Sequence, residues 1–279
     1  MHSGIAPPDE KAIRHFRNGM TETGTFKRVM KAFDWRLHKK GYIPLSKQII
    51  DASLVPAPKQ RNTDDERQAI KDGNRRRRSG PMTRPRQHKR TQVRYKDGKP
   101  LPMIALPVFG YKSHISIDRL YGFIRAGEVT SAAHADGRML RHVIAENSSS
   151  EVWADTAYRS RTNETWLADR MLISRIHLRK PKGQSMPTAT ARANAAKSAI
   201  RARIEHVFAH QRNRSGLFIR TIDIKRADAK LTLANLAYNF DRLIFTNDAQ
   251  RQHESALNPV NGREMSYAMI KKDARRSAP

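Results

Sequence analysis

The order of its apolar segments limits the fold of this chain more than any other feature of the sequence. Two β-rich runs, "LPMIALPVFGYKSHISID" and "LYGFIRAGEVTS", are separated by a turn near Asp118 and predict a β-hairpin. A short helix at "GRMLRHVIAE", a strand at "EVWAD", a helix at "RTNETWLADR" and a strand at "LISRIHL" follow. A hairpin followed by alternating helices and strands is typical of a mixed sheet covered by helices. We therefore predict an α/β fold built on an α+β mixed sheet.

Helices are predicted on both sides of this region. Residues 8–41 place apolar side chains at helical spacing and end at Gly41, but they are too short to form a domain alone. After the basic loop "RKPKGQSMP", two more helices are predicted over about 191–212 and 227–245. The sequence thus predicts a partial helical region, one large domain and a loosely ordered tail, which are residues 1–45, 46–247 and 248–279.

The charge of the chain predicts a polyanionic partner. Lys and Arg number 54 against 26 acidic residues, which gives a formal net charge of +28. Such a chain repels itself unless it binds a polyanion, and nucleic acid is the first candidate. Residues 59–99 hold fifteen basic and five acidic residues and predict a flexible basic loop. A run of four arginines in this loop is a candidate for neutralising phosphates: Arg75, Arg76, Arg77 and Arg78.

Other partners and ligands are excluded by what the sequence lacks. No apolar stretch approaches the roughly 20 residues that span a bilayer, and no signal-peptide core is present, so we expect a cytoplasmic protein without a membrane partner. The absence of cysteine excludes disulfides and thiolate metal sites. Carboxylates and the eleven histidines remain as possible metal ligands, and hard cations such as Mg²⁺ suit carboxylates best.

Two aspartates lie in or just after apolar runs of strand length. Asp51 lies within "SKQIIDASLVPAP", and Asp155 follows "EVWA". Taken singly, each is most simply explained as a residue that caps a backbone N–H at the end of a strand. If the two strands are parallel neighbours, however, both side chains emerge at the same edge of the sheet, where such sheets place their ligands. Two carboxylates there would repel each other unless cations lay between them.

The helix predicted over 191–212 carries a third carboxylate. At 100° per residue, Ser198, Arg201, Glu205 and Arg212 lie within about 60° of one another, next to an apolar face. The simple interpretation is a solvated Arg201–Glu205 pair at i,i+4. The alternative is that Glu205 joins the two aspartates in binding two Mg²⁺ ions for an in-line phosphoryl displacement, while the basic side chains hold DNA.

Five blocks of the sequence carry a family resemblance. "IIDASLVPAPKQRN", "FGYKSHISID", "EVWADTAYRS", "RARIEHVFAHQ" and "LANLAYNFDRLIF" resemble, in order, the signature blocks of DDE transposases of bacterial insertion sequences, in the insertion-sequence-five group. The resemblance covers nearly all of residues 8–247. It implies a ribonuclease H-like catalytic fold in which Asp51, Asp155 and Glu205 are catalytic and hold two Mg²⁺ or Mn²⁺ ions.

The resemblance extends to the residues around Glu205. The family's motif is Tyr, two residues, Arg, three residues, Glu, six residues, Lys. This sequence matches at Arg201 and Glu205, with Ser198 in place of the Tyr and Arg212 in place of the Lys. The match implies that Arg201 and Arg212 contact DNA phosphate, because arginine keeps the charge of lysine. Relatives carry a longer helical region before "APPDEKAIRHFR", so the chain resembles a form shortened at its N-terminus.

Several other side chains have more than one interpretation. Lys112 and His114 alternate on one strand face, and they either reach the scissile phosphate or are simply exposed. His206 and His210 have an i,i+4 spacing that can bind Zn²⁺, but no "HExxH" is present and we do not expect a metal there. Core packing explains the three tryptophans without base stacking: Trp35, Trp153 and Trp166.

The leading hypothesis from these observations is a Mg²⁺-dependent transposase. Its implied partners are double-stranded DNA, as terminal inverted repeats and as target, and a second copy of the chain when assembled on DNA. The implied location is the bacterial cytoplasm, in association with the nucleoid. The alternatives are a transposase remnant that binds DNA without catalysis and, with less support, a basic RNA-binding protein.

Overall fold

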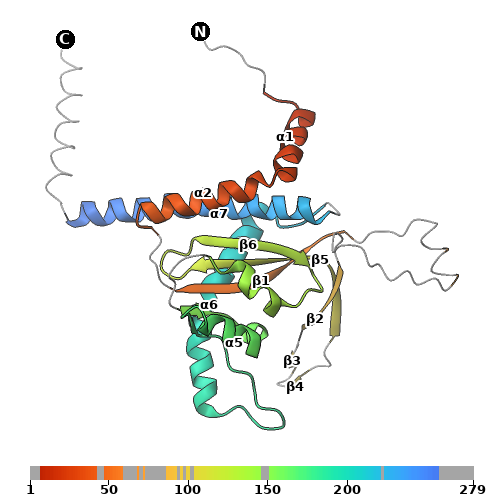
Figure 1. The fold of residues 1–279 in the computed structure, drawn as a ribbon, viewed down its shortest axis with the longest axis vertical. Coiled ribbons are helices and arrows are strands. Elements are labelled where there is room, and N and C mark those ends of the chain that lie inside the picture. The colour runs from red at the N-terminus through yellow and green to blue at the C-terminus, as the bar shows by residue number, and fades with distance from the viewer. Residues whose placement is uncertain are drawn as a thin grey trace. The chain divides into compact units, whose positions relative to one another are not determined.

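The computed structural model describes residues 7–42, 47–58, 68, 72, 86–92, 95–96, 99–100, 104–145, 151–220 and 223–257. Two compact units make up the chain, Met1–Tyr238 and Asn239–Pro279. The first unit contains the sheet and all the candidate site residues that the structure describes (Figure 1). In the second unit the described residues, 239–257, are the C-terminal part of helix α7, Ile224–Leu257.

A mixed sheet forms the centre of the first unit. Five of its six strands are β1 (Gln48–Pro56), β5 (Ile104–Asp118), β6 (Ile124–Ser131), β7 (Glu151–Trp153) and β8 (Ile173–Ser174). They lie in the order β6-β5-β1-β7-β8. β5 is antiparallel to both β1 and β6, whereas β7 is parallel to β1 and β8 is parallel to β7. The predicted hairpin is therefore β5–β6, and it lies beside β1 (Figure 1). This is the mixed sheet that the order of the apolar segments predicts.

Helices cover both faces of the sheet because both faces are apolar. Successive residues of a strand face opposite sides, and Ile49 and Ile50 of β1 belong to different core clusters. The Ile49 cluster includes residues of α6 (Thr188–Ser215), α7 and α2 (Thr25–Lys39). The Ile50 cluster includes residues of α4 (Leu140–Val143) and α5 (Arg161–Ala168). Since Asp51 shares the orientation of Ile49, its side chain belongs to the α6 side of the sheet.

The predicted N-terminal helical segment consists of two helices. α1 (Glu10–Glu22) buries no residue, and α2 begins after Gly24, whose φ of 65° favours glycine. α2 buries three apolar side chains, Phe26, Met30 and Leu37, and Met30 belongs to the Ile49 cluster. A buried ion pair also joins Asp34 of α2 to Arg125 of β6, with 2.9 Å between Arg125 Nη2 and Asp34 Oδ2.

Two segments are more ordered than the sequence predicts. Within the predicted loop 59–99, β2 (Arg86–Gln92) pairs antiparallel with β5, and β3 (Tyr95–Lys96) pairs with β4 (Lys99–Pro100). Strand pairing uses backbone groups, so a basic composition does not prevent it. α7 continues to Leu257, ten residues into the predicted tail's range, because "DAQRQHESAL" contains helix-forming residues and neither Gly nor Pro.

The tryptophans fit the core expectation unequally. Trp153 lies in the core and Trp166 packs partly buried against it, as expected. For Trp35 the expectation is wrong, because 56% of it is exposed and Lys39 Nζ lies 4.1 Å from its ring centre. None of the helices among the described residues is long and apolar enough to cross a membrane.

Candidate active site

Asp51 lies in the middle of the central strand of the sheet. Its neighbours are β5 on one side and β7 on the other. Asp51 Oδ1 accepts a hydrogen bond of 2.8 Å from the backbone N–H of Ala52, and Oδ2 accepts one of 2.7 Å from Arg201 Nη2. Only 16% of the Asp51 side chain is exposed. The Asp51 carboxylate is therefore largely shielded from solvent, and each of its oxygens accepts a hydrogen bond.

Asp155 comes level with Asp51 through the register of two parallel strands. β1 and β7 pair Gln48 with Val152 and Ile49 with Trp153. Continuing this register two residues past the last pair brings Asp51 and Asp155 side by side, because each strand advances equally. Asp155 Oδ1 caps the following turn η2 (Thr156–Tyr158) with a hydrogen bond of 2.8 Å from Ala157 N. The capping role expected of a strand-end aspartate is thus present together with its proximity to Asp51.

Glu205 reaches the same region from α6. Its Oε1 lies 3.9 Å from Arg201 Nη2, and 67% of its side chain is exposed. This is the i,i+4 pair expected from the helix, yet the same guanidinium also bonds Asp51. Because Ile204, Val207 and Phe208 of α6 pack on the sheet, the neighbouring stripe of the helix with Arg201 and Glu205 faces β1.

The electrostatics of the three carboxylates centre on Arg201. Burial acts against the Arg201 charge, but the attraction of Asp51, Asp155 and Glu205 outweighs it and raises the pKa of Arg201. Burial also raises the pKa of Asp51; Arg201 opposes this effect, and the negative charge of Asp155 adds to it. The three acidic residues from three segments therefore act on one cation.

The chemistry of these donors fits a divalent metal ion. Carboxylate oxygens are the ligands that Mg²⁺ and Mn²⁺ prefer. In the part of the chain that the structure describes, no three acidic or histidine side chains stand close enough together to enclose an ion. The cation that contacts Asp51 and Glu205 is the Arg201 guanidinium.

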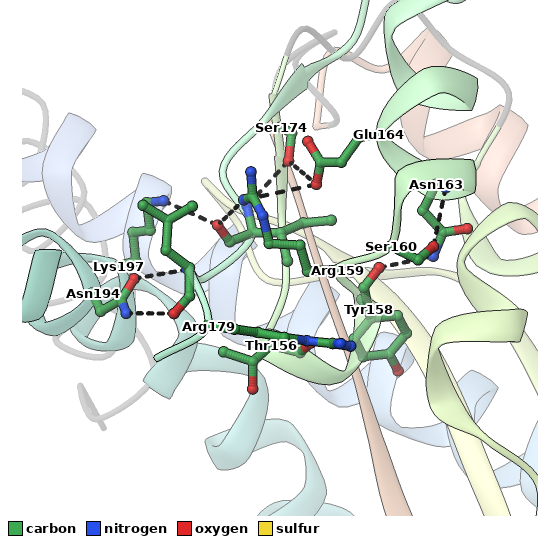
Figure 2. A network of polar contacts seen from close by, with 12 residues as sticks. Thr156, Tyr158, Arg159, Ser160, Asn163, Glu164, Ser174, Arg179, Asn194 and Lys197 are labelled. Atoms are coloured by element: carbon green, nitrogen blue, oxygen red, sulfur yellow. Dashed lines mark hydrogen bonds and ion pairs between the residues drawn. The ribbon is translucent and has the colours of Figure 1, made fainter. Parts of the chain in front are cut away.

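A polar network braces the segment that carries Asp155 (Figure 2). Asn163 Nδ2 donates hydrogen bonds of 2.8 Å to the carbonyls of Tyr158 and Gly137. Arg179 donates to the carbonyl of Thr156, and Lys197 of α6 donates to the carbonyl of Ile176. These bonds join the turn after Asp155, α5 and α6, and they fix Asp155 relative to the helix that carries Arg201 and Glu205.

The remaining predicted arginines have different placements. Arg212 of α6 donates a hydrogen bond of 3.3 Å from Nη1 to Ser53 Oγ of β1, on the strand face that it shares with Asp51. Arg212 is exposed. The four arginines of the basic run lie outside the described residues: Arg75, Arg76, Arg77 and Arg78.

Lys112 and His114 are not exposed, so that interpretation is wrong. Lys112 Nζ forms an ion pair of 2.8 Å with Asp136, and His114 Nε2 shares a hydrogen bond of 2.8 Å with Thr130 Oγ1. Burial lowers the pKa of His114 to about 4. Alternation identifies residues on one face, but here helices cover that face. With Lys112 at 6% and His114 at 0% exposure, a phosphate contact by either side chain loses its support.

His206 and His210 show no metal-binding arrangement among the described residues. His210 instead packs edge-on against Tyr238, with 5.2 Å between ring centres. Two other buried polar groups lie near the acidic residues, and the sequence analysis assigned no role to either. His177 Nε2 and the Tyr158 hydroxyl are buried and have no hydrogen-bond partner within the described part of the chain. Burial raises the pKa of Tyr158 and lowers the pKa of His177, and the negative charge of Asp155 acts to raise both. No sequence signal distinguishes His177, which follows the strand at "IS" without a motif.

The sheet order and the acidic residues at its centre define a ribonuclease H-like fold of the DDE type. The family model described as "Transposase DDE domain" matches residues 44–240, which is more than half of the chain. The chain therefore belongs to the DDE transposase family. The comparison with curated proteins gives no match. Transposases of this family bind DNA and generally use divalent metal ions.

Proposed function

We propose that the protein cuts the ends of a transposable element and joins them to target DNA by two-metal phosphoryl transfer. The observation that carries the proposal is the convergence of Asp51, Asp155 and Glu205, from a central strand, a strand end and a helix, on the single guanidinium of Arg201. Membership of the family supports a transposase.

Each residue has a role that follows from its chemistry. Asp51, Asp155 and Glu205 would hold two Mg²⁺ or Mn²⁺ ions, which when bound lower the pKa of the attacking oxygen and stabilise the leaving oxygen. Arg201 and Arg212 lie on the same stripe of α6 and would grip the phosphates on either side of the scissile bond, since a guanidinium binds phosphate through two hydrogen bonds. The network around Asn163 and Lys197 would keep the turn after Asp155 in place during the reaction.

Water is proposed to attack a phosphodiester bond at the transposon end first, which frees a 3′-hydroxyl. That hydroxyl then attacks a phosphodiester bond of the target, which forms a new bond to the target's 5′-phosphate and releases the target's 3′-hydroxyl, so this second step leaves the number of phosphodiester bonds unchanged. Two copies of the protein, one at each transposon end, would carry out the joined reaction. The many uncompensated cations of the chain, with a net charge of +28, favour binding to duplex DNA.

The test is cleavage of duplex oligonucleotides that carry the terminal inverted repeats of the element, in Mg²⁺ or Mn²⁺. We expect Asp155→Asn to cleave at least on the order of 100-fold more slowly than the wild type. Even residues that only hydrogen-bond to a metal ligand contribute about 10- to 100-fold to metal affinity or activity. The matched control is Asp169→Asn, which removes an exposed carboxylate at the end of α5. Equal cleavage by wild type and Asp155→Asn would rule out the role assigned to Asp155.

A further inference from the structure

We propose that Arg201 closes the acidic site to metal ions until DNA phosphate draws its guanidinium away. This inference rests on the proposed function, in which Asp51, Asp155 and Glu205 hold the ions. It adds a regulatory property, namely that metal binding and DNA binding at this site strengthen each other.

The contacts of Asp51 show why an ion and Arg201 compete. Arg201 Nη2 donates a hydrogen bond of 2.7 Å to Oδ2, and the backbone N–H of Ala52 donates one of 2.8 Å to Oδ1. The bond from Ala52 is local to β1, but the guanidinium reaches Asp51 from another element. A divalent ion that binds Oδ2 has to occupy the space of this guanidinium. Charge repulsion between the ion and the cation adds to the steric conflict.

Arg201 is also poised to accept another anion. Only 15% of its side chain is exposed, and its Nε is buried without a hydrogen-bond partner within the described residues. An arginine has five N–H donors in a fixed fork, and a phosphate can accept two of them at once. A phosphate could therefore engage donors that Asp51 leaves unpaired. The exposed Glu205 and the nearby Arg212 mark the side from which DNA reaches this helix stripe.

The consequence is a coupling between the two ligands. When DNA holds Arg201, the carboxylates lose their counter-cation and bind a divalent ion more tightly. Thermodynamic reciprocity requires that the ion tighten DNA binding by the same factor. Without DNA, Arg201 offsets part of the negative charge of the site and occupies Asp51, so the affinity for metal is low and the chemistry does not start before the substrate is in place.

The experiment measures Mn²⁺ binding to the full chain by the electron paramagnetic resonance signal of free Mn²⁺, with and without a short duplex. Asp51→Asn protein with the same duplex gives the background from ions bound to DNA. We expect wild type to bind Mn²⁺ at least about tenfold more tightly with DNA than without it, within the usual range of coupling between sites. Arg201→Gln should bind Mn²⁺ tightly without DNA and lose most of the coupling.

Two further variants separate occupation of the site from a general effect of charge. Arg201→Lys keeps the charge without the planar fork, and it should retain only part of the coupling. Arg192→Gln removes an exposed cation on the N-terminal part of α6, outside the acidic site, and it should leave Mn²⁺ affinity within about twofold of wild type. Thermal melts of all variants check that they are folded.

The outcomes are distinguishable. If Arg201→Gln and wild type bind Mn²⁺ equally, with or without DNA, while Asp51→Asn abolishes binding, the gate is wrong and the proposed function stands. If neither wild type nor Arg201→Gln binds more Mn²⁺ than Asp51→Asn under either condition, the metal site itself is wrong and both proposals fail.

Discussion

Arg201 of α6 donates a hydrogen bond of 2.7 Å to Asp51 of β1, across 150 positions of the sequence. The bond joins α6 to the central strand at the position that Asp155 also reaches. Glu205 of the helix, Asp51 of the central strand and Asp155 at a strand end therefore all interact with the one charge of Arg201. The same bond places a cation among the carboxylates that are proposed to hold metal ions.

The position of Arg212 predicts a measurable share of DNA binding. Arg212→Gln should lower the slope of log K against log salt concentration by about 1, because the loss of one phosphate contact removes about 0.9 from that slope. The measurement is DNA affinity by fluorescence anisotropy over a range of salt concentrations. Arg192→Gln is the control, since Arg192 is exposed on the N-terminal part of α6. An equal slope for Arg212→Gln and wild type would contradict the phosphate contact.

The turn after Asp155 leaves no space for a side chain at Gly137. A Cβ there would lie 2.5 Å from the carbonyl oxygen of Ala157, which belongs to the backbone of that turn. Gly137→Ala should lower the free energy of unfolding by about 1–3 kcal/mol and slow DNA cleavage, because the turn and Asp155 must shift. Chemical denaturation and the cleavage assay measure the two effects.

Gly19→Ala provides the comparison for Gly137→Ala. Gly19 lies in α1, and a Cβ there would meet nothing within 4 Å. This substitution should leave cleavage unchanged and raise stability by up to about 1 kcal/mol, because alanine favours a helix more than glycine does. Full activity and stability in Gly137→Ala would show that the turn does not depend on this close approach.

Burial of His114 predicts a loss of stability in acid. Its pKa is lowered from 6.5 to about 4, chiefly by burial. Because the unfolded chain binds the proton more readily, this contribution to stability is complete above pH 6.5 and is lost as the pH falls toward about 4. It amounts to at most about 3 kcal/mol. His114→Gln should therefore show a shallower fall in the free energy of unfolding across this range, measured by urea denaturation.

His15→Gln is the control for this pH dependence, because His15 is exposed on α1. It should follow the wild-type pH profile. If His114→Gln also follows that profile, proton uptake by His114 does not accompany unfolding in this range.

The main elements of the fold could be predicted because their signals are local. Apolar runs of strand length gave β1, β5, β6 and β7, and helical spacing gave α6 to within about three residues at each end. It also gave α7, which continues about twelve residues past its predicted end. The proximity of Asp51 and Asp155 followed from assuming parallel neighbours, which β1 and β7 are. β2 was not predicted, because its basic sequence gives no apolar signal for a strand and the strand is held by backbone pairing with β5.

The partners of individual side chains could not be predicted in the same way. Helical spacing indicated Glu205 as the partner of Arg201, whereas the shorter contact, to Asp51, depends on how α6 packs on the sheet. Alternation along β5 placed Lys112 and His114 on one face, but only the packed structure reveals that this face is covered. The unpaired Nε2 of His177 likewise follows from tertiary packing.

The central claim is that Asp51, Asp155 and Glu205 hold divalent ions when DNA is bound. The most direct measurement is a crystal structure of the protein with duplex DNA and Mn²⁺, with an anomalous difference map recorded at the manganese absorption edge. The account predicts manganese peaks at about 2.0–2.3 Å from carboxylate oxygens of Asp51 and Asp155, with Arg201 turned from Asp51 to phosphate. Manganese bound elsewhere, with Arg201 still on Asp51 in the DNA complex, would contradict it.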